Sequence, residues 1–171
     1  NTVFNWQTDC SHLQNNGCNQ SSTYTFVFKI QDNFCPIPAV SLTTLSVTVL
    51  PPSVVPKTEI LCADVLPNGD VTLSWTPPLD PDNSFTQYDI YNGVNLIASI
   101  PTLSTSTFTH IGADAQNASR PYRIVVRSGC NGANALSSDT VNTIFLNVNN
   151  PGNGTALLQW NPLVVPNHNS S

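Results

Sequence analysis

The sequence predicts an all-β chain built of tandem antiparallel β-sandwiches and taken from a longer protein. Apolar and polar side chains alternate along many short segments, which puts every second side chain on one face of a strand. The segments between them are short and rich in Pro, Gly and Asn, which favour turns. No helical periodicity persists for two turns. Short strands separated by frequent turns are typical of sandwiches rather than of parallel α/β sheets.

Two strands and a linker are predicted in the first part of the chain, residues 1–52. The first strand carries four apolar side chains on one face, Tyr24, Phe26, Phe28 and Ile30. The second strand carries three, Leu45, Val47 and Val49. Prolines follow at positions 51, 52 and 56, and they favour extended backbone and cannot donate to a sheet ladder. We therefore predict a linker between modules at this place.

Residues 53–147 are predicted to form one complete module. Asn68-Gly69 is a dipeptide typical of tight turns, and an alternating strand follows it, so a hairpin is expected. The same alternation returns near Tyr88 and again near Tyr122. We predict that the apolar residues of these three segments form the core, with Trp75, Tyr88 and Tyr122 as its largest members.

A further module is predicted to begin near the end of the chain. The turn, alternating strand, Trp and Pro of residues 68–77 recur in register at residues 153–162. The spacing between these two segments along the chain corresponds to the length of one sandwich module. Residues 148–171 are therefore predicted to be the first strands of a truncated module, with Trp160 as its core residue. Because the chain begins at Asn1 with neither Met nor an export segment, we expect an excerpt.

The composition excludes some partners. Charged residues are 9% of the 171-residue chain, and the net charge is −5. A chain without a basic stripe is a poor ligand for phosphates, so no nucleic-acid partner is expected. No apolar run approaches the roughly 18 residues that a membrane helix needs, so no membrane insertion of this segment is expected.

Five cysteines predict an oxidising compartment. They are Cys10, Cys18, Cys35, Cys62 and Cys130. No pair has the Cys-x-x-Cys spacing of a structural zinc site, so disulfides outside the cytosol are the better interpretation. The odd number leaves one thiol without an internal partner, or paired with a cysteine outside this sequence.

The middle module resembles a fibronectin type III domain. Residues 73–78, Leu-Ser-Trp-Thr-Pro-Pro, resemble the second strand of that family, whose Trp forms the centre of the core. Residues 88–91 look like the third strand, and residues 121–126 look like the sixth, with Tyr122 at the place of the corner tyrosine. The resemblance implies the fold and leaves the ligand open.

Residues 1–52 resemble the second half of an immunoglobulin- or cadherin-like module. The Phe4-x-Trp6-x-Thr8-x-Cys10 segment, the strand that follows and Cys35-Pro36 are similar to repeats of very large surface proteins of Bacteroidota-type gliding bacteria. The resemblance implies a Cys10–Cys35 pair, which Cys18 leaves in doubt. In the middle module it implies a Cys62–Cys130 pair, which would stabilise by roughly 4 kcal/mol on the chain-entropy model.

Further expectations come from the same resemblance. Such proteins are exported by the type IX secretion route and act as adhesins or filaments in gliding motility. They also build O-linked glycans on Asp-Ser/Thr-apolar motifs, which Thr140 matches between Asp139 and Val141. The resemblance therefore implies an extracellular or cell-surface location and a possible glycan at Thr140.

Candidate metal ligands are few and scattered. The histidines, His12, His110 and His168, lie in three different modules without a second ligand at metal spacing. Acidic residues near the segment after Pro77-Pro78, namely Asp80, Asp82 and Asp89, could hold calcium, although a solvated loop is the better interpretation. Asp32 beside Asn33 could bind calcium at a module junction or could cap a turn. We predict no metal and no cofactor.

The sequence also lacks the motifs of common catalytic sites. A Gly-x-Ser-x-Gly elbow and a Gly-rich phosphate loop are missing, so we expect no enzyme activity. Trp6 is predicted to be a core residue, whereas Phe34 and Phe85 lie in polar loops as candidates for exposed contact or as loop anchors. Asn-x-Ser/Thr triplets at Asn19, Asn117, Asn153 and Asn169 are of the number that chance would produce.

We therefore expect a structural and adhesive segment of a large secreted or cell-surface protein, acting as a spacer or as part of a filament. Its partners would be other modules of the same chain, surface glycans or other surface proteins. Two alternatives remain open. One is a carbohydrate- or receptor-binding ectodomain that uses the loops at one end of a sandwich. The other is an accessory module of a secreted hydrolase.

Overall fold

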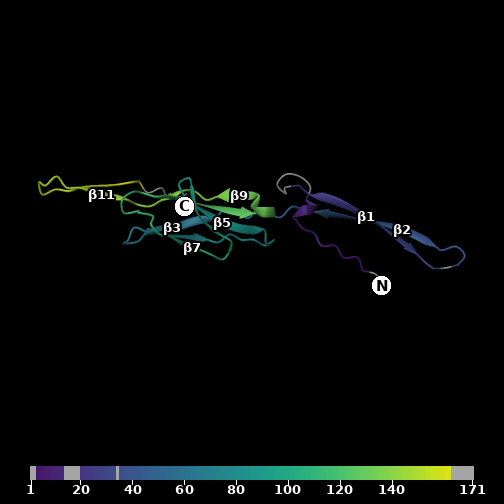
Figure 1. Cartoon of the computed structure of the whole chain (residues 1–171). Helices are drawn as coiled ribbons and strands as arrows, with labels where there is room; N and C mark the ends of the chain where they lie inside the picture. Colours follow the sequence, from purple (N-terminus) through teal and green to yellow (C-terminus); the bar gives the residue numbers. More distant parts are fainter. Residues whose placement is uncertain (1–2, 14–19, 34, 163–171) are drawn as a thin grey trace. The chain divides into compact units, whose positions relative to one another are not determined.

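The computed structural model of the chain describes residues 3–13, 20–33 and 35–162. The chain divides into two compact units, Asn1–Pro52 and Ser53–Ser171. Within the described residues the regular structure consists of antiparallel strands and two 3-10 turns, so the all-β prediction is confirmed (Figure 1). The division falls at the proline-rich stretch where the sequence predicts a linker.

The first unit is a long hairpin with an aromatic face. Strands β1 (Ser22–Gln31) and β2 (Val40–Val49) pair along all ten positions, from Ser22 opposite Val49 to Gln31 opposite Val40. Two aromatic rings of the segment before the 3-10 turn η1 (Cys10–His12) pack on this hairpin. The Phe4 and Trp6 rings each lie 4.9 Å from the Phe26 ring, measured between centroids. Trp6 is half-buried by these contacts.

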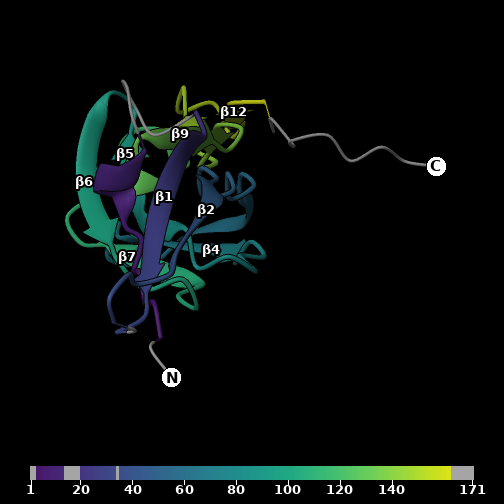
Figure 2. The same ribbon diagram turned by 90° about the vertical axis from the view of Figure 1, so that its right-hand side faces the viewer.

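The second unit contains three antiparallel sheets, of which two are larger and the third is the short β11–β12 pair described below. One sheet has the order β3-β4-β7, with β3 at Glu59–Val65, β4 at Val71–Thr76 and β7 at Thr107–His110. The other has the order β10-β8-β5-β6, and β9 also pairs with β8. Its strands are β5 (Phe85–Asn92), β6 (Asn95–Ile100), β8 (Pro121–Ser128), β9 (Asn134–Ser137) and β10 (Val141–Asn142). Figures 1 and 2 show β7 on one side of this unit and β9 on the other.

One hydrophobic core joins the two larger sheets of the second unit. The alternating residues of β4 and β5 supply most of its large side chains, with Trp75 2% exposed and Tyr88 0% exposed. Strand β8 adds Tyr122, Ile124 and Val126, each 0% exposed. Polar neighbours such as Thr72 and Ser74 point away from this core, as the period of two requires. The core therefore lies between the faces that the alternation identified.

The Asn-Gly turn forms the predicted hairpin between β3 and β4. The Leu66 amide donates to the Asp70 carbonyl at 2.8 Å, and Val65 lies opposite Val71. Gly69 has a φ of +86°, a conformation that glycine adopts without strain. Its amide donates to the Leu66 carbonyl at 2.9 Å. This tight turn sets the register that points Val71 into the core.

The repeat near the end of the chain forms strands but no core. Strands β11 (Leu146–Asn149) and β12 (Leu157–Trp160) pair as a separate two-stranded sheet in which every residue is exposed. Trp160 is 63% exposed, so its prediction as a core residue is wrong. The reason is that no second sheet covers this hairpin within the described residues. The predicted start of this module at residue 148 falls within β11, which begins at Leu146.

The cysteine pairs expected from the family resemblance are not formed. Cys35 and Cys62 are free and exposed, whereas Cys10 and Cys130 are both disulfide-bonded. A register shift between Ile60 and Cys62 turns the Cys62 side chain away from the core, and its thiol donates to Asp64 Oδ1 at 3.2 Å. The Cys10–Cys35 and Cys62–Cys130 pairs were therefore wrong predictions. Cys18 lies outside the described residues.

Candidate functional site

Polar side chains gather on the outer face of the second unit's larger sheet. Because Tyr88 and Ile90 face the core, their neighbours on β5 point the other way. Asp89 and Gln87 lie on this outer face, and Arg127 of β8 lies opposite Gln87 in the register. This group is unusual in a chain with 9% charged residues. We define Thr86, Gln87, Asp89, Arg127, Asn131 and Gly132 as the outer-sheet pocket.

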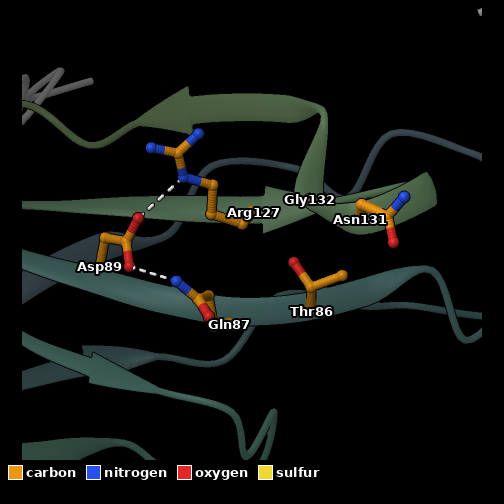
Figure 3. Close-up of a pocket in the computed structure, with 6 residues that line it drawn as sticks. All are labelled: Thr86, Gln87, Asp89, Arg127, Asn131 and Gly132. Carbon is orange, nitrogen blue, oxygen red and sulfur yellow. Dashed lines mark hydrogen bonds and ion pairs between the residues drawn. The ribbon is translucent and has the colours of Figure 1, made fainter. Parts of the chain in front are cut away.

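Asp89 is the centre of this arrangement. It is 3% exposed, and both of its carboxylate oxygens accept hydrogen bonds (Figure 3). Gln87 Nε2 donates to Oδ1 at 2.6 Å, and Ser99 Oγ donates to the same oxygen at 2.7 Å. Arg127 Nε donates to Oδ2 at 2.8 Å. The carboxylate is therefore held by three neighbouring side chains from three strands.

The electrostatics of the pair favour the ionised forms. Burial alone would raise the pKa of Asp89, but the hydrogen bonds from Ser99, Arg127 and Gln87 outweigh it, and the pKa lies below its ordinary value. The Asp89 carboxylate in turn raises the pKa of Arg127. Asp89 and Arg127 are thus both charged at neutral pH and neutralise one another.

The pocket beside this pair has a volume of about 340 Å³. Its floor includes Thr86, at a register shift between Phe85 and Gln87 where β5 bulges. The opposite wall is the 3-10 turn η2 (Cys130–Gly132). Figure 3 shows the Thr86 hydroxyl pointing toward this turn. Thr86 Oγ1 is buried and has no hydrogen-bond partner in the part of the chain that the structure describes.

Gly132 keeps the pocket open. Its φ is +68°, and a Cβ at this position would lie 3.0 Å from Thr86 Oγ1. Any side chain at this position would both strain the backbone and close the gap between the turn and Thr86. On the same outer face, the Arg123 guanidinium covers the Tyr91 ring at 3.9 Å from its centroid. That ring face is therefore already occupied.

Two of the acidic residues considered as calcium ligands, Asp80 and Asp89, are engaged in hydrogen bonds of the fold. Asp80 accepts from the Ser84 and Phe85 amides at 2.9 and 2.8 Å and so caps its own loop. Asp89 belongs to the ion pair with Arg127. Among the described residues, no three His, Cys, Asp or Glu side chains gather in a way that could hold a metal. Asp32 accepts from the Ala39 amide at 2.8 Å and closes the loop between β1 and β2.

The remaining candidates lie apart from the pocket. His12 contacts Asp9 at 2.9 Å, and Thr140 is exposed between β9 and β10. Phe85 is the first residue of β5 and packs on Tyr88 with 4.7 Å between ring centroids, so it anchors the start of this strand rather than offering an exposed contact. Asn117 and Asn153 hold turns through their side chains. His168, Phe34, Asn19 and Asn169 lie outside the described residues.

His110 makes the stability of the second unit sensitive to pH. Its Nδ1 lies 2.8 Å from the Tyr122 hydroxyl. Burial lowers the pKa of His110, and the charge of Arg120 lowers it further. The charge of Asp70 acts in the opposite direction but does not outweigh them. Burial also raises the pKa of Tyr122 to about 12, so this hydroxyl keeps its proton. The unfolded histidine binds a proton near pH 6.5, whereas the folded one resists it.

We therefore expect the free energy of unfolding to fall as the pH drops from about 6.5 through the lower folded pKa of His110. Urea denaturation of the whole chain between about pH 7.5 and 5 measures this slope. His110→Gln should flatten it, because the amide does not titrate. An equally steep slope in the variant would contradict this account. The carboxylates with lowered pKa values, Asp80 and Asp89, do not interfere, because they titrate below the pH range of the experiment.

Comparisons with known proteins supply no family for this chain. No protein-family model matches it, and no curated protein is significantly similar to it. None of the helices in the described part of the chain is long and apolar enough to cross a membrane.

Sequence reasoning missed the outer-sheet pocket. Asp89 was considered only as a calcium ligand, and Arg127, Gln87 and Thr86 were not considered at all. A signal was present, since a charged residue between Tyr88 and Ile90 in an alternating strand must lie on the outer face. Its partner, however, is set by the pairing of β5 with β8, 38 residues further along the chain.

Proposed function

We propose that this chain is a non-catalytic structural segment of a large secreted or cell-surface protein, in which it acts as a spacer or as part of a filament. The observation that carries the proposal is the division of the chain at a proline-rich stretch into consecutive β units. The second unit encloses its own core. Units that fold on their own contacts and follow one another along the chain suit a role that separates other parts of the protein.

The second unit is interpreted as a fibronectin type III-like sandwich. Its strand order supports this interpretation, because Trp75 lies on the second strand of the unit, Tyr88 on the third and Tyr122 on the sixth. These are the places that the resemblance assigns to them. The contact of the Tyr122 hydroxyl with His110, in the preceding strand, is also in keeping with a corner tyrosine.

An extracellular location is part of the proposal. The disulfide-bonded Cys10 and Cys130 support it, since disulfides persist in oxidising compartments. Export by the type IX route and a role in gliding adhesion rest on the resemblance of the sequence. The exposure of Thr140 in the segment after β9 is compatible with an O-linked glycan at that residue.

Mechanical extension tests the spacer role. The whole chain is held by its two ends under reducing conditions and stretched in a single-molecule force experiment. We expect one main unfolding step from the second unit, releasing roughly 90 residues, or about 30–32 nm of chain at 3.3–3.6 Å per residue. A smooth extension without such a step would contradict a role in which this unit resists stretching. Trp75→Ala is the control, because loss of the core should lower the force of this step.

A further inference from the structure

Asn-Gly dipeptides occur four times in the described part of the chain, and the backbone amide of the glycine is held in only three of them. The pairs are residues 68–69, 92–93, 131–132 and 153–154. The first three glycine amides donate to the carbonyls of Leu66, Pro121 and Gly129 at 2.9, 2.9 and 3.2 Å. The amide of Gly154 donates to no residue that the structure describes. Gly154 therefore presents its amide to water.

The space around these glycines differs in the same way. Gly69 and Gly132 are buried, and a Cβ on Gly132 would lie 3.0 Å from Thr86 Oγ1. A Cβ on Gly154 would have no atom within 4 Å apart from its neighbours in the chain. Every residue from 151 to 160 is exposed. Within the described residues, nothing shields the turn between β11 and β12 from solvent.

The asparagine side chains of the two repeated turns show the same contrast. Asn68 Oδ1 accepts from the Asp70 amide at 3.2 Å, and Asn68 Nδ2 donates to Asp70 Oδ2 at 2.6 Å, so both ends of the side-chain amide are held. Asn153 Oδ1 accepts from the Thr155 amide at 3.1 Å and from the Thr155 hydroxyl at 2.6 Å. Hydrogen bonds to a carbonyl oxygen stabilise the negative charge that develops there when its carbon is attacked. Asn153 Nδ2 donates to no described residue, so it is not held back as a leaving group.

We propose that Asn153 is a site of spontaneous deamidation, in which the Gly154 nitrogen is the nucleophile. Hydroxide removes the amide proton of Gly154, and the nitrogen then attacks Asn153 Cγ within the same chain. A bond forms between this nitrogen and Cγ, the bond from Cγ to Nδ2 breaks, and ammonia leaves after taking a proton from water. Water then opens the resulting succinimide ring at either of its two carbonyl carbons. The products are aspartate and isoaspartate, and water is the only substance consumed.

The modification would alter the β11–β12 hairpin. Either product places a carboxylate in a turn that carried a neutral amide. Isoaspartate also routes the backbone through the former side chain, which adds one methylene between Cα and the next nitrogen. The hairpin has no buried residue, so nothing in its own packing resists this change. The inference goes beyond the spacer role and does not depend on it.

The test is a timed incubation of the whole 171-residue chain at about pH 8, where hydroxide removes amide protons faster. Digestion with pepsin at acid pH then stops the reaction, and mass spectrometry follows each Asn-Gly peptide for the mass gain of deamidation. Chromatography separates the aspartate and isoaspartate forms. We expect residue 153 to convert at least about tenfold faster than residue 68. Residues 92 and 131 should also convert more slowly than residue 153, because their glycine amides are held.

The same incubation in concentrated urea separates the effect of the fold from that of the sequence. Unfolding removes the hydrogen bonds that hold the glycine amides, so the identical dipeptides should react at similar rates. We expect the ratio of the rates at residues 153 and 68 to fall to about threefold or less. A ratio that stays as large in urea as in the folded chain would overturn the proposal, because the flanking residues would then determine it.

Two variants of the same turn test the role of the Gly154 nitrogen. Gly152 and Gly154 have φ values of +78° and +82°, and an added Cβ meets no atom within 4 Å at either, so a side chain strains the turn similarly at both. Gly154→Ala should slow the conversion of residue 153 about tenfold, because the Cβ crowds the attacking nitrogen. Gly152→Ala is the matched control and should slow it less than about threefold. Equal slowing in the two variants, or equal conversion of residues 153 and 68 in the folded chain, would overturn the proposal.

Discussion

Trp75→Ala is expected to lower the free energy of unfolding of the second unit by about 3–5 kcal/mol, the usual cost of emptying a large buried aromatic site. Trp75 is 2% exposed and packs edge-on against Tyr88, with 5.5 Å between ring centroids. The substitution leaves a cavity between two sheets that cannot collapse without moving strands. Since domains are stable by about 5–15 kcal/mol, this loss is a large part of the total.

Trp160→Ala is the matched control for this experiment. Trp160 ends the same sequence pattern as Trp75, but it is 63% exposed in the β11–β12 hairpin. Its replacement should change the free energy of unfolding by less than about 1 kcal/mol. Urea denaturation followed by circular dichroism measures both variants without relying on tryptophan fluorescence. Equal losses in the two variants would show that the burial of Trp75 does not support the fold as described.

Asp89→Ala is expected to lower the free energy of unfolding by about 2–4 kcal/mol. Breaking a buried ion pair by removing one partner costs about 3–5 kcal/mol, and the estimate is reduced because the Arg127 side chain is 35% exposed to water. The substitution also deprives Gln87 and Ser99 of their acceptor. The loss would appear as a lower urea midpoint with an unchanged slope.

Asp139→Ala is the control for the ion pair. Asp139 contacts Lys57 at 3.2 Å, with side chains 51% and 56% exposed, so its loss should cost less than about 1 kcal/mol. The pH dependence adds a second criterion. Because the fold lowers the pKa of Asp89, its contribution is present above the unfolded pKa of about 3.9 and disappears as the pH falls through the folded value. The Asp89→Ala variant should lack this acid-side loss. Similar costs for the two aspartates would contradict the buried pair.

Much of the strand pattern could be predicted because it depends on near neighbours in the chain. Alternation identified β1, β4, β5 and β8, and it placed Trp75, Tyr88 and Tyr122 on faces that are buried in the structure. The Asn-Gly dipeptide likewise identified the β3–β4 turn, because a positive φ at Gly69 is a local requirement. The proline-rich stretch marked the division between the units because the effect of proline on the backbone is also local.

The outcome at other positions depended on contacts between distant parts of the chain. Trp75 and Trp160 end nearly the same sequence pattern, yet within the described residues only Trp75 is covered by a second sheet. Cys62 turns outward because of a register shift against β4, and no spacing of cysteines shows such a shift. The Asp89–Arg127 pair and the gap between Thr86 and Gly132 likewise exist only once β5 lies beside β8 and η2.

The alternation of apolar and polar residues predicts which side of a strand a residue occupies, because that follows from the backbone. What lies across from that side is decided by strand pairing and sheet packing, and these determined the core and the candidate site of this protein.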